Sequence, residues 1–384
     1  MRVYVLGAGA SYPRYPLGGE LFNRIDDYVR GSAPMFDRFD YGKDWPEVLA
    51  WLESNKNPLL REAYRTRNIE QVFTALDLAQ LLRSESLVSI LRAGKGDQNA
   101  ITAAETAFNS IDSETQSYQN VRRILLRATE AYFEQRHYDD QKDFTDPSWD
   151  TLKKFSDKLA EDDVVVTLNY DSTIERVLLN EGKWSPSDGY GSKLVFQKTR
   201  SDQTLVSFPP SKVKILHLHG AIGWYRKPHI RSDYPLTGNG GAIPRDALTP
   251  APLETRISLD PIFLQTMGIF AVDASLPHRP PDDYQILLHP SYLKDYGGED
   301  TGNDVFVGIW RAASEALRAA EQVAIIGYSL PPADSAAWTL LLTSCDDRKT
   351  TVVNPDRAVM SRYRIVLKLP VLRPAQDFAT WLRS

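Results

Sequence analysis

Two histidines stand two residues apart in the stretch KILHLHG, residues 214–220, at the end of an apolar run. A neutral imidazole accepts a proton near physiological pH, so His217 and His219 each have the chemistry of a general base. On a strand, side chains at this spacing share one face, which is also how a pair of metal ligands is arranged. The third interpretation is one working histidine beside a packed neighbour.

Asn169 and Asp171 form a second polar pair, just after the apolar run DVVVTL. If the strand continues through them, both side chains point the same way. A local interpretation competes with a functional one, because Ser172 and Glu175 match a capping box. In that case Asp171 serves only the start of a helix, whereas Asn169 lies outside the box. Both interpretations stay open for Asp171.

Five short apolar runs are each followed by small or hydrogen-bonding residues; the runs are residues 3–6, 163–168, 213–218, 323–326 and 350–353. Such runs are typical of strands buried on both faces, and helical patterns at 172–179 and 307–320 separate several of them. The alternation predicts an α/β, Rossmann-like fold with an open parallel sheet.

Ligands of such sheets bind beyond the carboxyl ends of the strands. We therefore expect one site, suited to a ribose and phosphate ligand, lined by Gly7, Ala8, Gly9, Ser11, Asn169, Asp171, His219, Gly327, Ser329, Asn354 and Asp356.

The first of these strand ends, GAGAS, carries glycines that permit a tight turn and close approach of N–H groups to a pyrophosphate. The same turn is also an ordinary strand-to-helix connection. Tyr12 occupies the third glycine position of G-x-G-x-x-G, and Asp26 and Asp27 fall within a helix-like stretch, so a hydride-transfer dehydrogenase is disfavoured. Ser329 lies in GYSLP, which lacks the second glycine of a serine-hydrolase elbow.

We expect one domain over residues 1–384. A helix-like stretch at 20–29 would complete the first strand–helix unit. Residues about 45–140 read as a helical insertion, with one apolar face of Ile69, Val72, Phe73, Leu76, Ala79 and Leu82. Prolines recur across residues about 227–304, which is typical of a lid or an arm.

Composition limits the function classes. A net charge of −5 gives no general attraction for nucleic acid. The single cysteine, Cys345, excludes an internal disulfide and a four-cysteine zinc site. The N-terminal stretch lacks the pattern of a signal peptide and no apolar segment is long enough to span a membrane, so we expect a cytoplasmic protein.

Several motifs in this order resemble the sirtuin-like superfamily, and within it the bacterial sirtuin-like NAD-consuming defence proteins. They are GAGAS with YPLGGEL, NIEQVFTAL, TLNYDSTIE, LHLHG, HPSYLKD, WRAASEALRAAEQVAIIGYSLPPAD and VVNPD. The chain departs from protein-deacylating sirtuins because the interval from Gly220 to Gly327 contains no cysteine and so no zinc ribbon. Water is then the expected acceptor rather than an acyl-lysine.

The resemblance implies an NAD⁺ glycohydrolase that cleaves NAD to nicotinamide and ADP-ribose. Asn169 would orient the ribose or the attacking water, His219 would accept a proton, and Asp171 would fix the nicotinamide end or stabilise positive charge. The pyrophosphate would lie at Gly7, Gly9 and Ser11, and the adenosine side at Ser329, Asn354 and Asp356. His217 is then a packed neighbour, and we expect neither zinc nor another metal.

The same resemblance implies an anti-phage effector that is kept inactive until triggered. We expect a homo-oligomer and a partner of the HerA-type hexameric ATPase class. A non-catalytic NAD or ADP-ribose sensor or scaffold is the alternative. Nuclease activity ranks third because the sequence shows no acidic metal cluster.

Overall fold

In the computed structural model the chain forms two compact units. The first comprises Met1–Tyr15, Glu134–Leu288 and Asp295–Ser384, and the second comprises Pro16–Phe133 with His289–Lys294. The structure describes residues 1–31, 41–79, 117–133, 135–136, 139, 144–186, 188–190, 210–226, 229–230, 248–249, 257–259, 285–287, 303–331, 334–346, 349–367 and 376–384.

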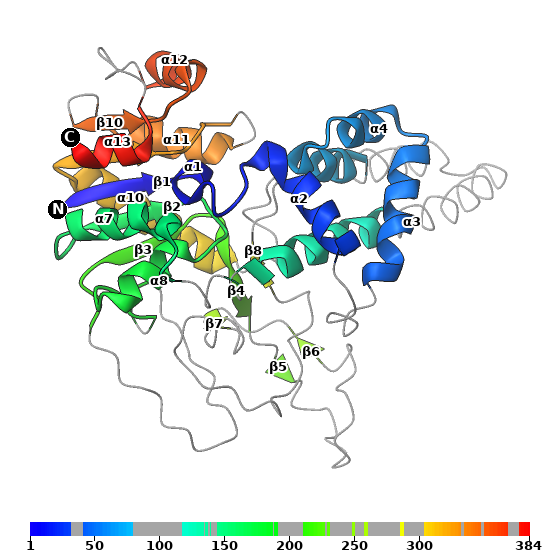
Figure 1. Cartoon of the computed structure of the whole chain (residues 1–384), viewed down its shortest axis with the longest axis horizontal. Helices are drawn as coiled ribbons and strands as arrows, with labels where there is room; N and C mark the ends of the chain where they lie inside the picture. Colours follow the sequence, from blue (N-terminus) through cyan, green and yellow to red (C-terminus); the bar gives the residue numbers. More distant parts are fainter. Residues whose placement is uncertain are drawn as a thin grey trace, which may run out of the picture. The chain divides into compact units, whose positions relative to one another are not determined.

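A five-stranded parallel sheet forms the centre of the first unit (Figure 1). Its strands are β1 (Arg2–Leu6), β2 (Val164–Thr167), β3 (Lys214–His217), β9 (Gln322–Ile326) and β10 (Thr350–Val353). The spatial order is β10-β9-β1-β2-β3, and every neighbouring pair is parallel. Each of the five predicted runs is one of these strands, which confirms the α/β, Rossmann-like open sheet.

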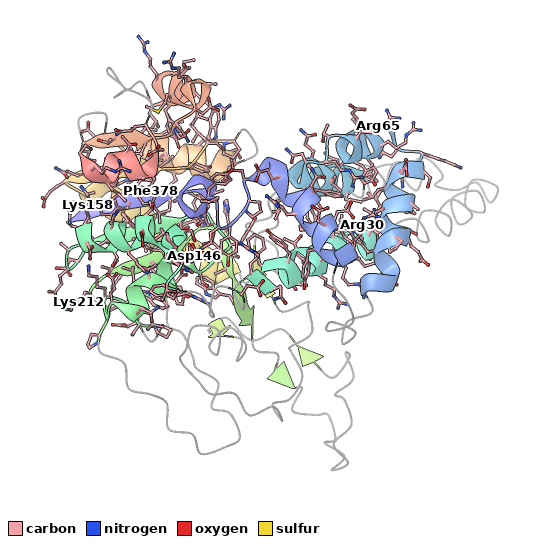
Figure 2. All side chains as sticks on the ribbon, in the orientation of Figure 1. Arg30, Arg65, Asp146, Lys158, Lys212 and Phe378 are labelled. Carbon is pink, nitrogen blue, oxygen red and sulfur yellow. The ribbon has the colours of Figure 1, made fainter. Side chains whose placement is uncertain are left out.

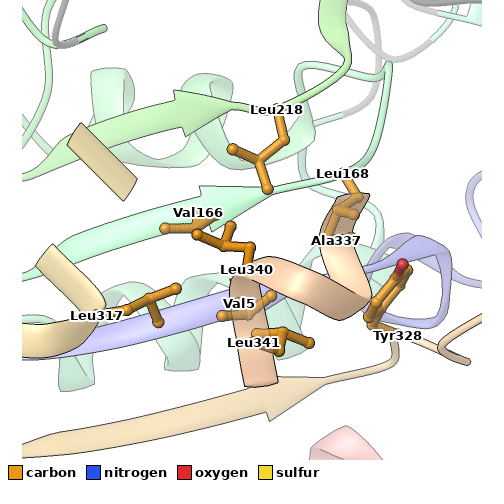
Figure 3. Close-up of a pocket in the computed structure, with 9 residues that line it drawn as sticks. All are labelled: Val5, Val166, Leu168, Leu218, Leu317, Tyr328, Ala337, Leu340 and Leu341. Carbon is orange, nitrogen blue, oxygen red and sulfur yellow. The ribbon is translucent and has the colours of Figure 1, made fainter. Parts of the chain in front are cut away.

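Two helices cover the face of the sheet that carries the Val5 side chain, opposite to the face that carries Tyr4. Val5 aligns with Val166 on β2, and both lie against α10 (Asn303–Ala319) and α11 (Ser335–Ser344). Figure 3 shows this apolar seam, in which Leu317, Leu340 and Leu341 point toward the strands. The seam leaves no room for a water molecule, so it is packed core rather than a ligand cavity.

The opposite face of the sheet packs against α7 (Asp150–Lys158) and α13 (Phe378–Arg383). The Tyr4 ring meets Phe155 edge to face at 5.1 Å, and Phe155 meets Phe378 at 5.4 Å between ring centroids. Phe378 is labelled on α13 in Figure 2. Helix α8 (Thr173–Asn180) packs beside α7. The helix predicted at 172–179 corresponds to α8, and the one predicted at 307–320 corresponds to α10, which begins earlier and ends at Ala319.

Short antiparallel strands lie between β3 and β9 in the chain. They are β4 (Gly220–Arg226), β5 (His229–Ile230), β6 (Leu248–Thr249), β7 (Ile257–Leu259) and β8 (Gln285–Leu287). They form a three-stranded sheet, β7-β4-β8, and a two-stranded sheet, β5-β6. The sequence pattern did not predict the strand at 220–226. Most of the proline-rich segment predicted at about 227–304, and the HPSYLKD motif, lie outside the described residues.

The second unit is helical where it is described. It contains α2 (Gly18–Gly31), α3 (Tyr41–Ser54), α4 (Pro58–Arg65) and helical residues 69–79 and 117–133. The predicted apolar face is buried at Ile69, Val72, Phe73, Leu76 and Ala79, while Leu82 lies outside the described residues. Helix α4 begins with Asn57, whose side chain accepts from the Leu59 amide, and with Pro58 in the first turn.

Helix α2 corrects one expectation. The helix-like stretch at 20–29 is helical, but α2 belongs to the second unit and does not complete a strand–helix unit with β1. A four-residue helix, α1 (Ala8–Ser11), follows β1 instead. Asp26 accepts hydrogen bonds from Arg30 and Trp45 inside the second unit, which gives this carboxylate a structural use.

Among the helices of the described residues, none combines the length and the apolar character that crossing a membrane requires. The last two helices of the chain, α12 (Arg357–Val366) and α13, lie with β10 in the first unit.

Candidate functional site at the carboxyl edge of the sheet

The carboxyl ends of the five parallel strands lie along one edge of the central sheet. The chain builds β1, β2 and β3 outward in one direction and later returns to place β9 and β10 on the other side of β1. The direction of winding therefore reverses between β1 and β9, and sheets of this kind bind ligands beside such a reversal.

Asn169 lies at this edge and is held by the loop after β1. Its side-chain nitrogen Nδ2 donates to the Gly7 carbonyl at 3.1 Å and to the Ser11 hydroxyl at 3.0 Å. A backbone carbonyl can only accept, so the amide nitrogen must face Gly7 and the orientation of the side chain is fixed. Among the described residues none donates to Asn169 Oδ1, which leaves this oxygen available to a ligand hydroxyl or a water molecule.

Asp171 continues the same hydrogen-bond chain. The Ser11 hydroxyl, which accepts from Asn169, donates to Asp171 Oδ1 at 3.1 Å. The Thr173 amide and hydroxyl donate to the same oxygen at 3.1 Å and 2.5 Å. Asn169 and Asp171 therefore meet at Ser11, although β2 already ends at Thr167.

Burial raises the pKa of the Asp171 carboxyl group. Hydrogen bonds from Thr173 and Ser11 act in the opposite direction, and the charge of Glu175 adds to the increase. Asp171 is thus a buried acid whose ionised form depends on the serine and threonine donors around it.

The capping-box interpretation of this region is wrong for Ser172 and Glu175. Ser172 is the residue before α8 but makes no side-chain capping bond. Asp171 does accept from the Thr173 amide at the start of the helix, so its local role is real. Glu175 turns inward to His217 instead of back to the helix start.

The two histidines of KILHLHG turn to different partners. Strand β3 ends at His217, so the alternation that would align the pair does not reach His219. His217 contacts Glu175 of α8, while His219 contacts Asp334 at the start of α11. Within the described residues, no three histidine, cysteine or acidic side chains gather as metal ligands.

His217 is fully buried. Its Nδ1 lies 3.1 Å from the Asn169 carbonyl oxygen, and its Nε2 is hydrogen bonded to Glu175 Oε1. The Tyr190 hydroxyl donates to the same carboxylate oxygen at 3.4 Å. Burial raises the pKa of Tyr190 well above its ordinary value, and the nearby Glu175 charge adds to the effect. This network supports the loop of Asn169 from behind.

His219 lies where the loops after β2 and β9 come together. Its Nδ1 is 3.2 Å from the Leu168 carbonyl oxygen, and its Nε2 is 3.2 Å from Asp334. The Tyr328 hydroxyl donates to Asp334 Oδ2 at 2.9 Å. The Tyr170 ring lies 6.2 Å from the imidazole, measured between ring centroids. His219 therefore contacts the backbone of Leu168, the residue before Asn169.

The glycines after β1 have a packing function in the structure. A Cβ on Gly7 would lie 2.5 Å from Tyr328 Cα, and one on Gly327 would lie 2.4 Å from the Ala10 nitrogen. Gly327 also has a φ of +65°, which favours glycine. The amides of Gly7 and Gly9 donate to the Ile326 and Gly327 carbonyls. These glycines let the loops after β1 and β9 touch, and pyrophosphate binding by them stays a prediction.

The remaining predicted residues lie toward the other end of the edge. Ala8 and Ser329 are exposed. Asn354 Oδ1 accepts from the Asp356 amide, and the Asp356 side chain caps α12 through the Ala358 amide. With strands about 4.8 Å apart, β10 lies ~14 Å from β2 across three strand spacings. The structure therefore does not bring Asn354 and Asp356 into the Asn169 cluster, and an adenosine-side role stays a prediction.

Sequence reasoning did not predict the side chains that hold the two histidines, namely Glu175 and Tyr190 for His217, and Asp334 and Tyr328 for His219. Asp334 follows GYSLPPA and Tyr328 lies within it, so both members of this hydrogen-bonding pair stand in one short stretch of the sequence. Glu175 was noticed, but as a helix cap. The contacts that give Glu175 and Asp334 their roles span large sequence separations.

In comparisons with known proteins, no family model matches the chain and no curated protein matches it.

Proposed function

We propose that this chain is an NAD⁺ glycohydrolase that converts NAD and water to nicotinamide and ADP-ribose. The observation that carries the proposal is the hydrogen-bond chain Asn169–Ser11–Asp171 at the ends of β1 and β2, with His219 beside it. The resemblance to sirtuin-like proteins indicates the reaction. The fixed Asn169 amide is a group that can orient a ribose hydroxyl or water in that reaction.

The reaction breaks the bond between nicotinamide nitrogen and ribose C1′, and the bonding electrons leave with nicotinamide. The positively charged sugar centre then takes the oxygen of water, and one proton is released. Asn169 Oδ1 is oriented to accept from a ribose hydroxyl or from that water, because Nδ2 is held by Gly7 and Ser11. Preorganised polar groups of this kind lower barriers because they need no reorganisation during the reaction.

Asp171 acts on this site through Ser11. Its Oδ1 accepts from Ser11, which in turn accepts from Asn169, so the carboxyl group sets the direction of the serine hydroxyl. A negative charge on Asp171 would also stabilise a developing positive charge at the ribose. His219 is the proton acceptor in this proposal.

The proposal is tested by nicotinamide release from NAD. Asn169→Ala removes the oriented amide and is expected to reduce release by about 100-fold or more. Asn180→Ala is the matched control, because Asn180 is exposed at the end of α8 and undergoes the same chemical change. Equal release from the wild type and Asn169→Ala would contradict the proposal.

A sensor or scaffold that binds NAD or ADP-ribose without turnover is the second candidate. Two observations favour it. The Gly7 and Gly9 amides donate hydrogen bonds to the Ile326 and Gly327 carbonyls rather than facing a ligand. Both ring nitrogens of His219 are hydrogen bonded within the protein. The two functions differ in the fate of the ligand. A sensor returns intact NAD after denaturation of the complex, whereas the hydrolase leaves nicotinamide and ADP-ribose.

We further propose that the activity serves anti-phage defence through NAD depletion, in a homo-oligomer that works with a HerA-type hexameric ATPase in the cytoplasm. Support for this comes from the motif resemblance alone. Light scattering of the purified chain tests the oligomer. Nicotinamide release with and without the ATPase tests whether the partner changes the rate.

A further inference from the structure

Asp334 is the buried carboxylate closest to His219 in the described structure, and the proposed reaction assigns it no role. His219 Nε2 lies 3.2 Å from each of its two oxygens. The contact joins the turn after β3 to the start of α11 across 115 residues of sequence. The side chains of His219 and Asp334 are 5% and 2% exposed, so little solvent weakens the electrostatic interaction between them.

The position of one proton on His219 follows from its other contact. Nδ1 faces the Leu168 carbonyl oxygen, which has no hydrogen to give, so Nδ1 must carry the hydrogen of that bond. The lone pair that can accept a proton is therefore on Nε2, facing Asp334. One exchangeable proton is then shared between the imidazole and the carboxylate.

Tyr328 fixes the far side of this pair. Its hydroxyl donates to Asp334 Oδ2 at 2.9 Å, and its own carbonyl accepts from the Tyr363 hydroxyl at 3.1 Å. The close approach of Gly7 to Tyr328 Cα further restricts where the tyrosine can lie. The carboxylate is thus held between two donors, a phenol and an imidazole.

We propose that Asp334 is a positioning residue for His219, and that the two side chains take up as one unit the proton that NAD hydrolysis releases. This inference rests on the proposed function. Water forms the new bond to C1′ and loses its surplus proton to Nε2, while nicotinamide leaves with the bonding electrons. The adjacent carboxylate favours the protonated ring, and the Tyr328 hydroxyl moderates this effect by sharing the carboxylate.

Other described residues also lie near the pair. From the loop after β2 comes the Tyr170 ring, with Asp171 one residue further along. Helix α10 contributes the Trp310 indole, which donates to the Leu218 carbonyl. The charged side chains of that helix nearest to Trp310 in sequence, Arg311 and Glu315, are exposed. The contact of Asp334 with His219 is close and buried, so removing the carboxylate charge should shift the pH response of His219.

The first test is the pH profile of nicotinamide release. Asp334→Asn keeps the shape but removes the charge, so the acid limb of the profile should move about one pH unit or more to lower pH. The plateau rate should also fall, because the base is weaker. Tyr328→Phe removes a donor from the carboxylate and should move the limb in the opposite direction, by less. A purely structural role would lower the rate without these opposite shifts.

Asp377→Asn is the matched control. Asp377 is an exposed aspartate that precedes a helix, as Asp334 does, but it caps α13 on the opposite face of the sheet. Its profile should coincide with that of the wild type. An unchanged acid limb in Asp334→Asn would overturn the inference.

A second readout does not depend on turnover. NMR titration of ¹⁵N-histidine-labelled protein without NAD follows the His219 ring, with its signal identified from the His219→Gln variant. The midpoint should move to lower pH in Asp334→Asn and to higher pH in Tyr328→Phe. Identical midpoints in all three proteins would overturn the shared proton. A wild type that shows these shifts but releases no nicotinamide would overturn the proposed function instead.

Discussion

His217 and His219 are two residues apart and have the same pattern of hydrogen bonds. In each, Nδ1 faces a backbone carbonyl at the end of β2, and Nε2 faces a buried carboxylate that also accepts from a tyrosine hydroxyl. They differ in where the fold places them. One network lies behind the sheet edge, and the other lies between loops at the edge.

The His217 network is enclosed by aromatic rings. Tyr190 and Trp224 lie 5.9 Å and 5.3 Å from the imidazole, between ring centroids, and Trp184 packs against Tyr190 at 4.8 Å. Glu175 is fully buried, and its Oε2 has no hydrogen-bond partner in the part of the chain that the structure describes. From these buried surroundings we infer that the His217 network stabilises the fold and holds the backbone of Asn169 in place.

The His219 network, in contrast, is assembled from three segments that meet at the carboxyl edge of the sheet. The loop after β2, the turn after β3 and the residues between β9 and α11 each supply one part. Because the two histidines share one hydrogen-bond pattern, this pattern does not by itself assign their roles. The proposed catalytic role of His219 rests instead on its position at the strand ends.

The largest expected effect is on catalysis at His219. His219→Ala removes the proposed proton acceptor, so nicotinamide release should fall by about 10²–10⁴-fold. The free energy of unfolding should fall by no more than ~1–3 kcal/mol, the range for losing buried hydrogen-bond partners. Steady-state rates and urea unfolding measure the two quantities. A strongly destabilised variant with normal activity per folded molecule would reverse the roles of the two histidines.

His217→Ala should act mainly on stability. It leaves Glu175 buried without the imidazole, and breaking a buried pair in this way costs about 3–5 kcal/mol. Urea unfolding of the variant gives the change in free energy. Nicotinamide release per folded molecule should stay within about tenfold of the wild type, because His219 is untouched. A small change in the free energy of unfolding would contradict this prediction, because it would mean that water or a structural rearrangement replaces the imidazole as the partner of Glu175.

Replacing both members of the buried pair sharpens this prediction. His217→Leu with Glu175→Leu removes the stranded charge, and apolar replacements of buried ion pairs are often neutral or stabilising. The double variant should therefore recover at least half of the stability that His217→Ala loses. A double-mutant cycle with both single leucine variants measures the coupling. Additive losses would mean that the two side chains do not act as a pair.

Asp171 gives the smallest and most pH-dependent effect. Because burial raises its pKa, the native state favours the protonated carboxyl group. That contribution to stability is fully present below the unfolded pKa near 3.8 and is lost as the pH rises through the native pKa. Asp171→Asn should flatten the decline by at most about 1.4 kcal/mol per pH unit. Urea unfolding at a series of pH values checks this, and equal slopes would contradict it.

The sheet was predictable because strands that are buried on both faces consist of consecutive apolar residues, and such runs are visible in the sequence. The amino-acid pattern alone also placed Asn169, Asp171 and His219 at one edge, since parallel strands share their carboxyl ends. Strand β4 was not predicted, because its glycines, Gly220 and Gly223, interrupt the pattern of a strand.

Long-range partners were not predictable from local pattern. Glu175 matched a capping box three residues after Ser172, yet its charge is used 42 residues away by His217. The different partners of His217 and His219 were likewise not predictable, and β3 ends at His217, before the second histidine. Strand ends and side-chain partners depend on packing between distant segments, which a single sequence does not record.

The most direct test of a catalytic His219 compares nicotinamide release from NAD by His219→Ala and by the double variant His217→Leu with Glu175→Leu. Both are assayed beside the wild type at temperatures where circular dichroism shows each to be folded. We predict loss of release in His219→Ala and retention within about tenfold in the double variant. Release that persists in His219→Ala but disappears in the folded double variant would contradict the catalytic role of His219.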